Sequence, residues 1–151
     1  MKRIFKSIRV LFVFVGILLC LPLFVGCSED ENNIEGDGSA IQFTINGSKC
    51  KNNMYKVSTL GGEYLLKSKN YGSLWLCSID EGTERVWSAY DEDHLDIRKI
   101  PFERDWYRVQ YDDQNNIVFY FQAMPVGVSS RSLTIGVQAI NTFGTFEFYQ
   151  E

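Results

Sequence analysis

From residue 40 onward, hydrophobic and polar residues alternate with a period of two in short runs. This period is typical of β-strands that bury one face, and turn dipeptides such as Asn46-Gly47 and Gly61-Gly62 separate the runs. The strands predicted in this part of the chain are residues 41–45, 55–57, 63–70 and 73–80, with weaker candidates at 85–90 and 95–99. Because no run shows the 3.6-residue period of an amphipathic helix, the pattern predicts an all-β fold.

The last third of the chain has the clearest alternation. Its predicted strands are residues 106–111, 117–122, 131–140 and 143–150. When the shortest and weakest of these segments are not all counted, about seven to nine strands at turn spacings of about 8–12 residues predict an antiparallel β-sandwich. Residues 73–80 are apolar on both faces, so we expect a central strand there, with Trp75, Cys77 and Ile79 on one face.

The first 26 residues follow a different pattern. Four basic residues lie within residues 1–9, and an apolar run of about fifteen residues follows at 10–24. A permanent membrane anchor is the alternative, but a spanning helix needs about twenty apolar residues, and Pro22 would disturb its last turn. The pattern therefore predicts an export signal peptide over residues 1–26.

The end of the apolar run, Gly26-Cys27, resembles the lipobox of bacterial lipoproteins, although Phe24 stands where that motif usually has leucine. The resemblance implies that Cys27 becomes the acylated N-terminus, carrying palmitate or similar chains that anchor the protein to the membrane. Residues 27–39 are polar and contain glycine, so we interpret them as a flexible acidic tether. Ser28 and the three acidic residues after it resemble the surface-export signal of Bacteroidetes lipoproteins, which implies the outer membrane and the cell surface; a solvated linker is the alternative.

Removal of the signal peptide changes the charge of the chain. Four of the 15 basic residues and none of the 19 acidic residues lie in residues 1–26, which leaves 11 against 19 and a net charge of −8. A module this acidic is a poor partner for phosphate backbones, so we expect no nucleic-acid binding.

Two of the four cysteines are accounted for before the folded part begins, because Cys20 lies in the signal peptide and Cys27 is the lipidation site. Cys50 and Cys77 remain, and in an exported protein they either form a disulfide or pack as two buried thiols. With a single histidine in the chain and no Cys-x-x-Cys pair, the sequence predicts neither a bound metal nor another cofactor.

Several landmarks fall in the order of one known module: Gly61-Gly62, Trp75, Trp106, Arg131 at the start of a strand, and a final strand ending in Phe148-Tyr149-Gln150. In this order they resemble the BACON domain, found in exported Bacteroidetes proteins. The resemblance implies an immunoglobulin-like β-sandwich over residues 40–151 and a carbohydrate- or mucin-binding role. The middle region, residues 81–103, is longer and more charged than in that family.

Sugar-binding sandwiches stack exposed aromatic rings on pyranose rings. Trp75 and Trp106 match positions that the family pattern keeps, and a mid-strand aromatic is usually in the core, so we expect both to be buried. Trp87 lies outside the family pattern beside an acidic stretch, and we expect it to be the exposed ring. Trp87, Tyr90, Asp91 and Asp93 are therefore the candidate ligand-binding residues. Asp91, Asp93, His94 and Asp96 form a compact acidic group with the oxygen ligands that calcium prefers, but acidic loops are more often only solvated.

The sequence contains no recognisable catalytic motif. His94 is the only histidine, and neither a Gly-x-Ser-x-Gly elbow nor a phosphate-binding glycine loop is present. We therefore expect a non-enzymatic lipoprotein that binds glycan or mucin at the cell surface. The alternative is a structural or accessory lipoprotein that binds an outer-membrane protein partner and no sugar.

Overall fold

The computed structural model describes residues 38–151. The predicted signal peptide, Cys27 and all but the last two residues of the tether lie outside the described residues. Among residues 38–151 no helix has the length and hydropathy needed to cross a membrane.

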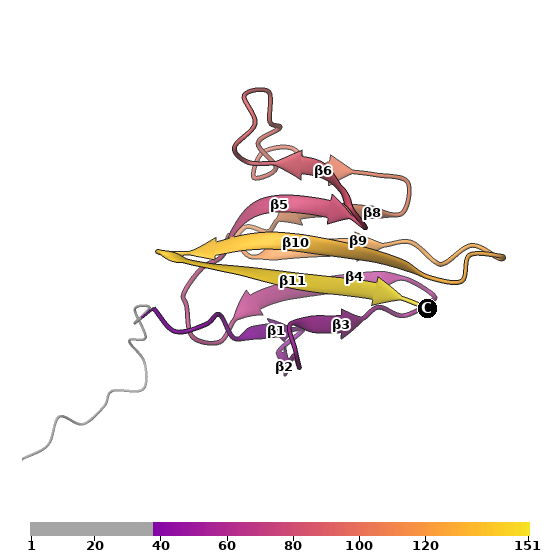
Figure 1. Ribbon diagram of the computed structural model, residues 1–151, viewed down its shortest axis with the longest axis horizontal. Coiled ribbons are helices and arrows are strands. Elements are labelled where there is room, and N and C mark those ends of the chain that lie inside the picture. The colour runs from indigo at the N-terminus through magenta and orange to yellow at the C-terminus, as the bar shows by residue number, and fades with distance from the viewer. Residues whose placement is uncertain (1–37) are drawn as a thin grey trace, which may run out of the picture. The chain divides into compact units, whose positions relative to one another are not determined.

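The described residues form eleven strands in two sheets that pack face to face (Figure 1). The strands are β1 (Phe43–Ile45), β2 (Ser48–Lys49), β3 (Met54–Lys56), β4 (Gly62–Ser68), β5 (Trp75–Glu81), β6 (Glu84–Ser88), β7 (Phe102–Glu103), β8 (Tyr107–Tyr111), β9 (Ile117–Phe121), β10 (Arg131–Ala139) and β11 (Thr142–Gln150). One sheet has the order β2-β1-β4-β9-β8-β7, and the other has the order β3-β11-β10-β5-β6.

The strand order is that of an immunoglobulin-like sandwich. The run β1-β4-β9-β8 corresponds to strands A, B, E and D of that fold, while β11-β10-β5 corresponds to G, F and C, with β6 as the extra edge strand of the second sheet. Strand β3 pairs parallel to β11, and all the other paired strands are antiparallel. The predicted all-β, immunoglobulin-like sandwich is confirmed.

The number of strands exceeds the prediction because β2 and β7 are two-residue strands too short to show a period. One predicted strand is wrong, since residues 95–99 lie in the long loop between β6 and β7. Leu95 and Ile97 alternate with polar residues there because they pack against the hydrophobic core, where Ile97 is buried.

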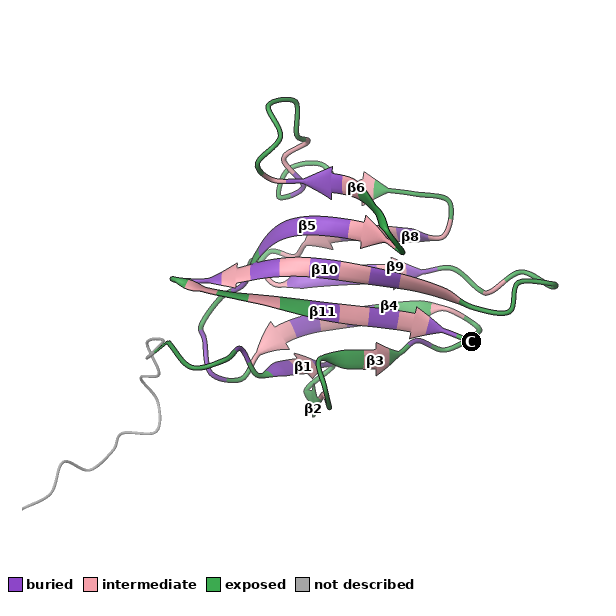
Figure 2. Cartoon of the chain, in the orientation of Figure 1, coloured by how far each residue is buried: buried purple, intermediate pink, exposed green. Residues whose placement is uncertain are grey.

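The core lies between the two sheets, where the strands alternate inward and outward residues (Figure 2). Strand β10 turns Leu133, Ile135 and Val137 inward, and they are almost completely buried. Aromatic rings fill much of the remaining space: the ring centres of Phe119 and Phe148 lie 4.7 Å apart. These rings hold the sandwich together and are unavailable to a ligand.

A β-bulge in β5 decides which side chains face outward near its start. Leu76 pairs with Val137 and Ser78 pairs with Gly136, so Cys77 is the extra residue of the bulge. The extra residue shifts the alternation, so Ile79 points into the core while Trp75 and Cys77 lie on the outer face. The prediction that Trp75, Cys77 and Ile79 share one face is therefore wrong.

The described chain enters the sandwich at the end where the β4–β5 and β10–β11 connections lie. The Tyr71 hydroxyl donates to the Ser39 carbonyl over 2.6 Å and lies 3.1 Å from the Thr142 hydroxyl. Asn70, which is buried, donates to the Ser39 hydroxyl and to the Ala40 carbonyl. These contacts fix the start of the domain to one end of the sandwich.

Candidate ligand-binding site

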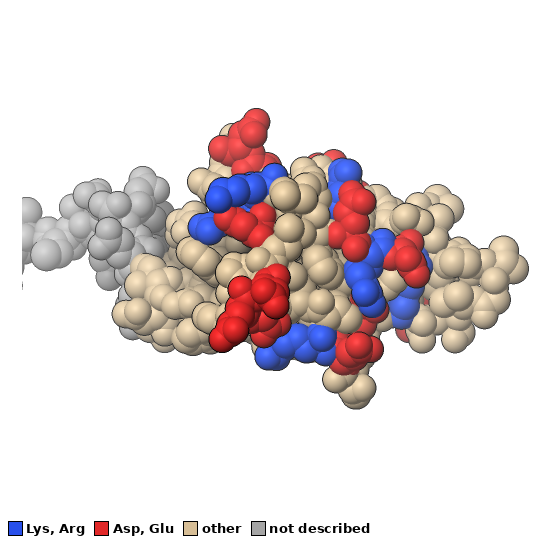
Figure 3. All heavy atoms as spheres, turned by 90° about the horizontal axis from the view of Figure 1, so that it is seen from above, with Lys and Arg blue, Asp and Glu red and all other residues tan. Residues whose placement is uncertain are grey.

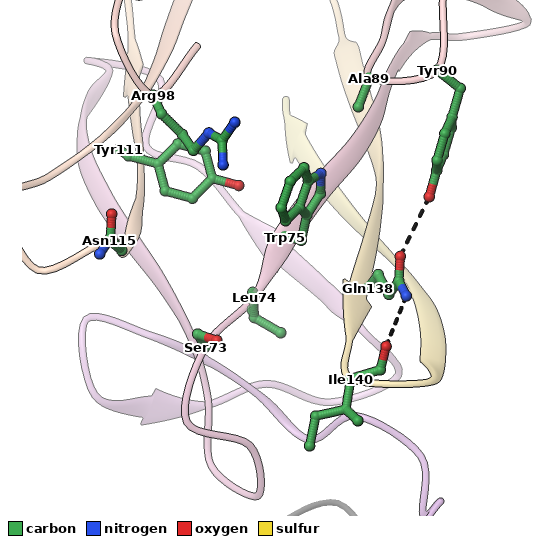
Figure 4. A pocket seen from close by; sticks show the side chains of 10 residues that line it. All are labelled: Ser73, Leu74, Trp75, Ala89, Tyr90, Arg98, Tyr111, Asn115, Gln138 and Ile140. Carbon is green, nitrogen blue, oxygen red and sulfur yellow. Dashed lines mark hydrogen bonds between the residues drawn. The ribbon is translucent and has the colours of Figure 1, made fainter. Parts of the chain in front are cut away.

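The same end of the sandwich carries a hollow of about 640 Å³. Four connections or strand ends line it, represented by Trp75 at the start of β5, Tyr90 after β6, Asn115 in the β8–β9 turn and Ile140 in the β10–β11 turn (Figure 4). Immunoglobulin variable domains use the corresponding end for ligand recognition. The volume lies within the range of about 300–1,000 Å³ that ligand sites usually have.

Trp75 is the large aromatic side chain at the centre of this hollow. It is 51% exposed, because the β5 bulge turns it to the outer face opposite Gln138 of β10. The guanidinium carbon of Arg98 lies 4.7 Å from its ring centre, a cation–π contact. Figure 4 shows the indole between Arg98 on one side and Gln138 on the other. An aromatic ring is therefore held in place while part of its surface stays open to solvent.

Arg98 is oriented by Asp96, which lies two residues before it in the β6–β7 loop. The Arg98 Nε atom donates to Asp96 Oδ1 over 3.0 Å. This hydrogen bond holds the pKa of the Asp96 carboxyl below its ordinary value and raises the pKa of Arg98. The two charges offset each other, and the exposed Lys99 side chain also contacts Asp96 Oδ2 at 3.5 Å.

Tyr90 and Gln138 form the opposite side of the hollow. The Tyr90 hydroxyl lies 3.4 Å from Gln138 Oε1 and 3.4 Å from the Cys77 sulfur, toward either of which it can donate. Gln138 in turn donates from Nε2 to the Ile140 carbonyl over 2.7 Å. The contact with Cys77 raises the pKa of Tyr90, so its phenol is uncharged at neutral pH. Tyr90 is nevertheless 67% exposed and presents its ring to solvent.

Tyr111, at the end of β8, supports the strand that carries Trp75. Its hydroxyl accepts a 2.7 Å hydrogen bond from the Leu76 backbone N–H, and burial raises its pKa. In the next turn the Asp112 carboxylate accepts from the backbone N–H groups of Gln114 and Asn116, both at 2.8 Å. These bonds shape the turn that brings the Asn115 side chain to the hollow.

Trp87 is not the exposed ring that the sequence predicts. It is only 7% exposed, because it pairs with Ile79 and shares that residue's inward direction. Its indole N–H donates to the Leu95 carbonyl over 3.2 Å, and its ring packs 6.4 Å from that of Phe102. The prediction for Trp87 is wrong, and Trp75 has the exposed position instead.

The structure brings only one of the four predicted ligand residues to the hollow. Tyr90 lines it, whereas Asp91 and Asp93 are exposed in the following loop and do not. Within residues 38–151 no group of three or more His, Cys, Asp or Glu side chains is placed to hold a metal ion. The acidic loop is therefore a neighbour of the hollow and not part of it.

Cys50 and Cys77 are free thiols in the structure, so the disulfide alternative is not the one observed. Cys77 belongs to β5 of the five-stranded sheet, where its sulfur contacts Tyr90. Cys50 follows β2 of the six-stranded sheet and is half-buried, and burial raises the pKa of its thiol. The two thiols therefore have separate surroundings.

Trp106 differs from both other tryptophans, because it is half-buried and lies outside the hollow. The Arg131 guanidinium carbon lies 4.7 Å from its ring centre, and Arg131 also donates to Gln150 and to the Gln122 carbonyl. This polar cluster closes the end of the sandwich opposite the hollow. Trp106 therefore packs between the core and a fixed cation, close to the buried position expected for it.

Sequence reasoning missed Trp75, Arg98, Gln138 and Asn115 as site residues. The period of β5 places Trp75 with the core residue Ile79, and only the bulge separates them. Arg98 lies in a loop with no period at all. The one available signal is the pair of small residues Cys77-Ser78 in mid-strand, which tolerates a bulge but does not demand one.

The charge distribution is mixed over one face of the molecule. On the face in Figure 3, basic and acidic side chains mostly lie close together, and wide uncharged areas separate the groups. The ion pair between Arg85 Nε and Asp80 Oδ1, at 2.9 Å, is one such pairing. A ligand recognised by a strong field of one sign is not favoured by this arrangement.

The fold and the site together define an immunoglobulin-like sandwich with a ligand-sized hollow among its loops. Among solved structures, the chain is similar to the NMR structure of a protein from Bacteroides thetaiotaomicron. The two are 27% identical with a TM-score of 0.55, over 79% of this chain and 92% of that chain. No family model matches the chain, and no curated protein matches it either. The similarity supports the sandwich fold.

Proposed function

We propose that the protein is an exported, lipid-anchored binding module that engages a glycan, without catalysis, in the hollow around Trp75. The observation that carries the proposal is the half-exposed Trp75 indole, fixed by Arg98 in a hollow of about 640 Å³. Stacking on a pyranose ring needs such an aromatic surface, held in place before the ligand arrives.

The chemistry around Trp75 favours a neutral, hydroxyl-rich ligand. Tyr90 and Tyr111 are uncharged phenols, and Gln138 and Asn115 are amides that can both donate and accept hydrogen bonds. The charge of Arg98 is offset by Asp96. A sugar presents apolar ring faces and polar edges, and this hollow combines one exposed indole with several uncharged polar groups.

The cellular setting of the proposal depends on the N-terminal sequence. The basic and apolar residues before Cys27, and the acidic residues after it, fit a lipoprotein exported to the outer membrane and displayed at the cell surface. The similar solved structure comes from Bacteroides thetaiotaomicron, a member of the group whose lipoproteins the acidic segment resembles. Acyl chains on Cys27 would then supply the membrane attachment.

A second candidate is a protein partner bound at the opposite end of the sandwich. Leu60 and Val126 are almost fully exposed there, on two loops joined by a hydrogen bond from Met124 N–H to the Thr59 carbonyl. Exposed apolar side chains that gather on neighbouring loops favour contact with another protein. This candidate predicts that Val126→Asp abolishes crosslinking to a recurring outer-membrane partner while Trp75→Ala leaves it intact.

Glycan-array binding tests the first proposal. The full chain is purified in a detergent without a sugar headgroup and applied to arrayed mucin O-glycans, N-glycans and neutral polysaccharide fragments. We expect binding to at least one class, weakened roughly tenfold by Trp75→Ala, which corresponds to about 1.4 kcal/mol of ring contact. Met54→Ala is the matched control, since Met54 is an exposed apolar residue that lines neither the hollow nor the surface around Leu60 and Val126. The proposal is wrong if nothing binds, or if both variants behave alike.

A further inference from the structure

A second hollow, of about 440 Å³, lies on the outer face of the five-stranded sheet beside the first. Its lining comes from β5, β6, β10 and β11, and includes Cys77, Ser78, Gly136 and Phe143. Tyr90 lines both hollows, and so forms the boundary between them. The two hollows are therefore neighbours along one surface, joined at a single exposed ring.

The floor of the second hollow is low because Gly136 has no side chain. A Cβ atom built there would lie 2.6 Å from the Ser78 Oγ atom of the paired strand. Ser78 is itself held by a 3.1 Å hydrogen bond from its hydroxyl to Asp80 Oδ2. The outer surface of the sheet therefore stays low at Gly136, and the larger side chains around this residue rise above it.

Phe143 gives the second hollow an exposed aromatic ring of its own. It is 66% exposed on the outer face of β11, and it pairs with Gln138, which in turn pairs with Trp75. Three adjacent strands thus place Trp75, Gln138 and Phe143 in one row. At about 4.8 Å between strands, the backbones at the ends of this row are about 10 Å apart.

The polar groups of the second hollow are also balanced in charge. Arg85 lines it and is paired with Asp80, whose carboxylate also accepts from Ser78. Thr145 adds an uncharged hydroxyl. The second hollow therefore has the same composition as the first, with an open ring, uncharged polar groups and a paired arginine.

We infer that the site takes an extended chain of at least three neutral sugar units, one against Trp75 and the next but one against Phe143. The Tyr90 and Gln138 side chains lie between the two rings and contact the middle unit. This inference rests on the proposed glycan-binding function and specifies the substrate class of the same site, a chain rather than a single terminal sugar.

The test measures affinity against chain length. The full chain, in the same sugar-free detergent, is titrated with series of neutral glycans that share one repeat and run from one sugar to six, starting from any class bound on the array. We expect affinity to rise between one sugar and about three. Phe143→Ala should remove this rise, roughly two- to tenfold, without weakening the shortest bound glycan, whereas Trp75→Ala weakens every length.

Two further variants make the result specific. Thr145→Arg fills the second hollow without removing a ring and should mimic Phe143→Ala, and Met54→Ala again serves as the control. Binding that depends on Trp75 but not on chain length, or a Phe143→Ala variant that matches the control at every length, overturns the inference and leaves the proposed function standing. If the full chain binds no glycan, the proposed function fails and the inference fails with it.

Discussion

Trp75 lies at the surface and Trp87 in the core, so alanine substitution at each should lower the free energy of unfolding by different amounts. Trp87 is 7% exposed and donates a hydrogen bond to the Leu95 carbonyl, whereas Trp75 is 51% exposed. A fully buried tryptophan removes up to about 250 Å² from water, worth about 6 kcal/mol at 25 cal/mol per Å² as an upper bound. Measured core substitutions of this kind cost about 3–5 kcal/mol, and we expect Trp87→Ala to fall in that range.

The area that Trp75 removes from water is about half as large, roughly 125 Å², which gives an upper bound of about 3 kcal/mol. No enclosed cavity remains after its removal because the hollow is open to water, so we expect Trp75→Ala to cost about 1–2 kcal/mol. This includes the lost contact with Arg98, worth about 0.5–1 kcal/mol at an exposed site. The difference between the two variants is therefore about 2–3 kcal/mol.

Urea unfolding followed by far-ultraviolet circular dichroism measures this difference without depending on tryptophan emission. A chain that begins at Ser28 keeps all of residues 38–151, which the structure describes. The unfolding midpoints should differ while the slope stays the same, as expected when stability changes and the exposed area does not. Equal midpoints, or a larger loss for Trp75→Ala, would refute the assignment of Trp75 to the surface and Trp87 to the core.

Three further predictions concern the surroundings of the site. Gly136→Ala should lose about 1–3 kcal/mol through the clash with the Ser78 hydroxyl, and a Ser78→Ala background should remove most of this loss in a double-mutant unfolding cycle; additive losses would contradict the clash. The pKa of Asp112 is lowered by its turn contacts, so its stabilisation is complete above its unfolded pKa, near 3.9, and is lost as pH falls through the lower folded pKa. Carboxyl ¹³C titration should place its midpoint below that of an unfolded reference peptide, and a midpoint at or above the reference would contradict this. In the chain that begins at Ser28, Cys50 and Cys77 are the two cysteines, and both should react with iodoacetamide after unfolding without reductant, giving two additions by mass spectrometry; no additions would indicate a disulfide.

Most of the fold could be predicted from the sequence because most strands bury one face and leave the other in water. Strands β10 and β11 each alternate through nine residues, and this regular pattern sets their boundaries to within a residue or two. The loop at 95–99 was misread for a physical reason. Its apolar side chains alternate because they pack under Trp87, not because they belong to a strand.

The site was much less predictable, because it depends on one inserted residue. The bulge at Cys77 turns Trp75 outward and leaves Ile79 inward, and the paired strand β6 then carries Trp87 inward with it. An alternation of hydrophobic and polar residues does not show where an inserted residue reverses the face that each side chain occupies. Tyr90, predicted as a ligand-binding residue beside Trp87, lines the hollow, and its role in binding stays a prediction.

The contacts of Ser39 with Tyr71 and Asn70 have a consequence for how the protein would meet its surroundings. They attach the start of the domain at the same end as the hollow, and ten residues lie between Cys27 and Gly38. Fully extended, such a segment spans at most about 40 Å. If Cys27 carries the lipid, that length limits how far the start of the domain can lie from the cell's own bilayer, and polymers rooted in that membrane then lie near the end that bears the hollow.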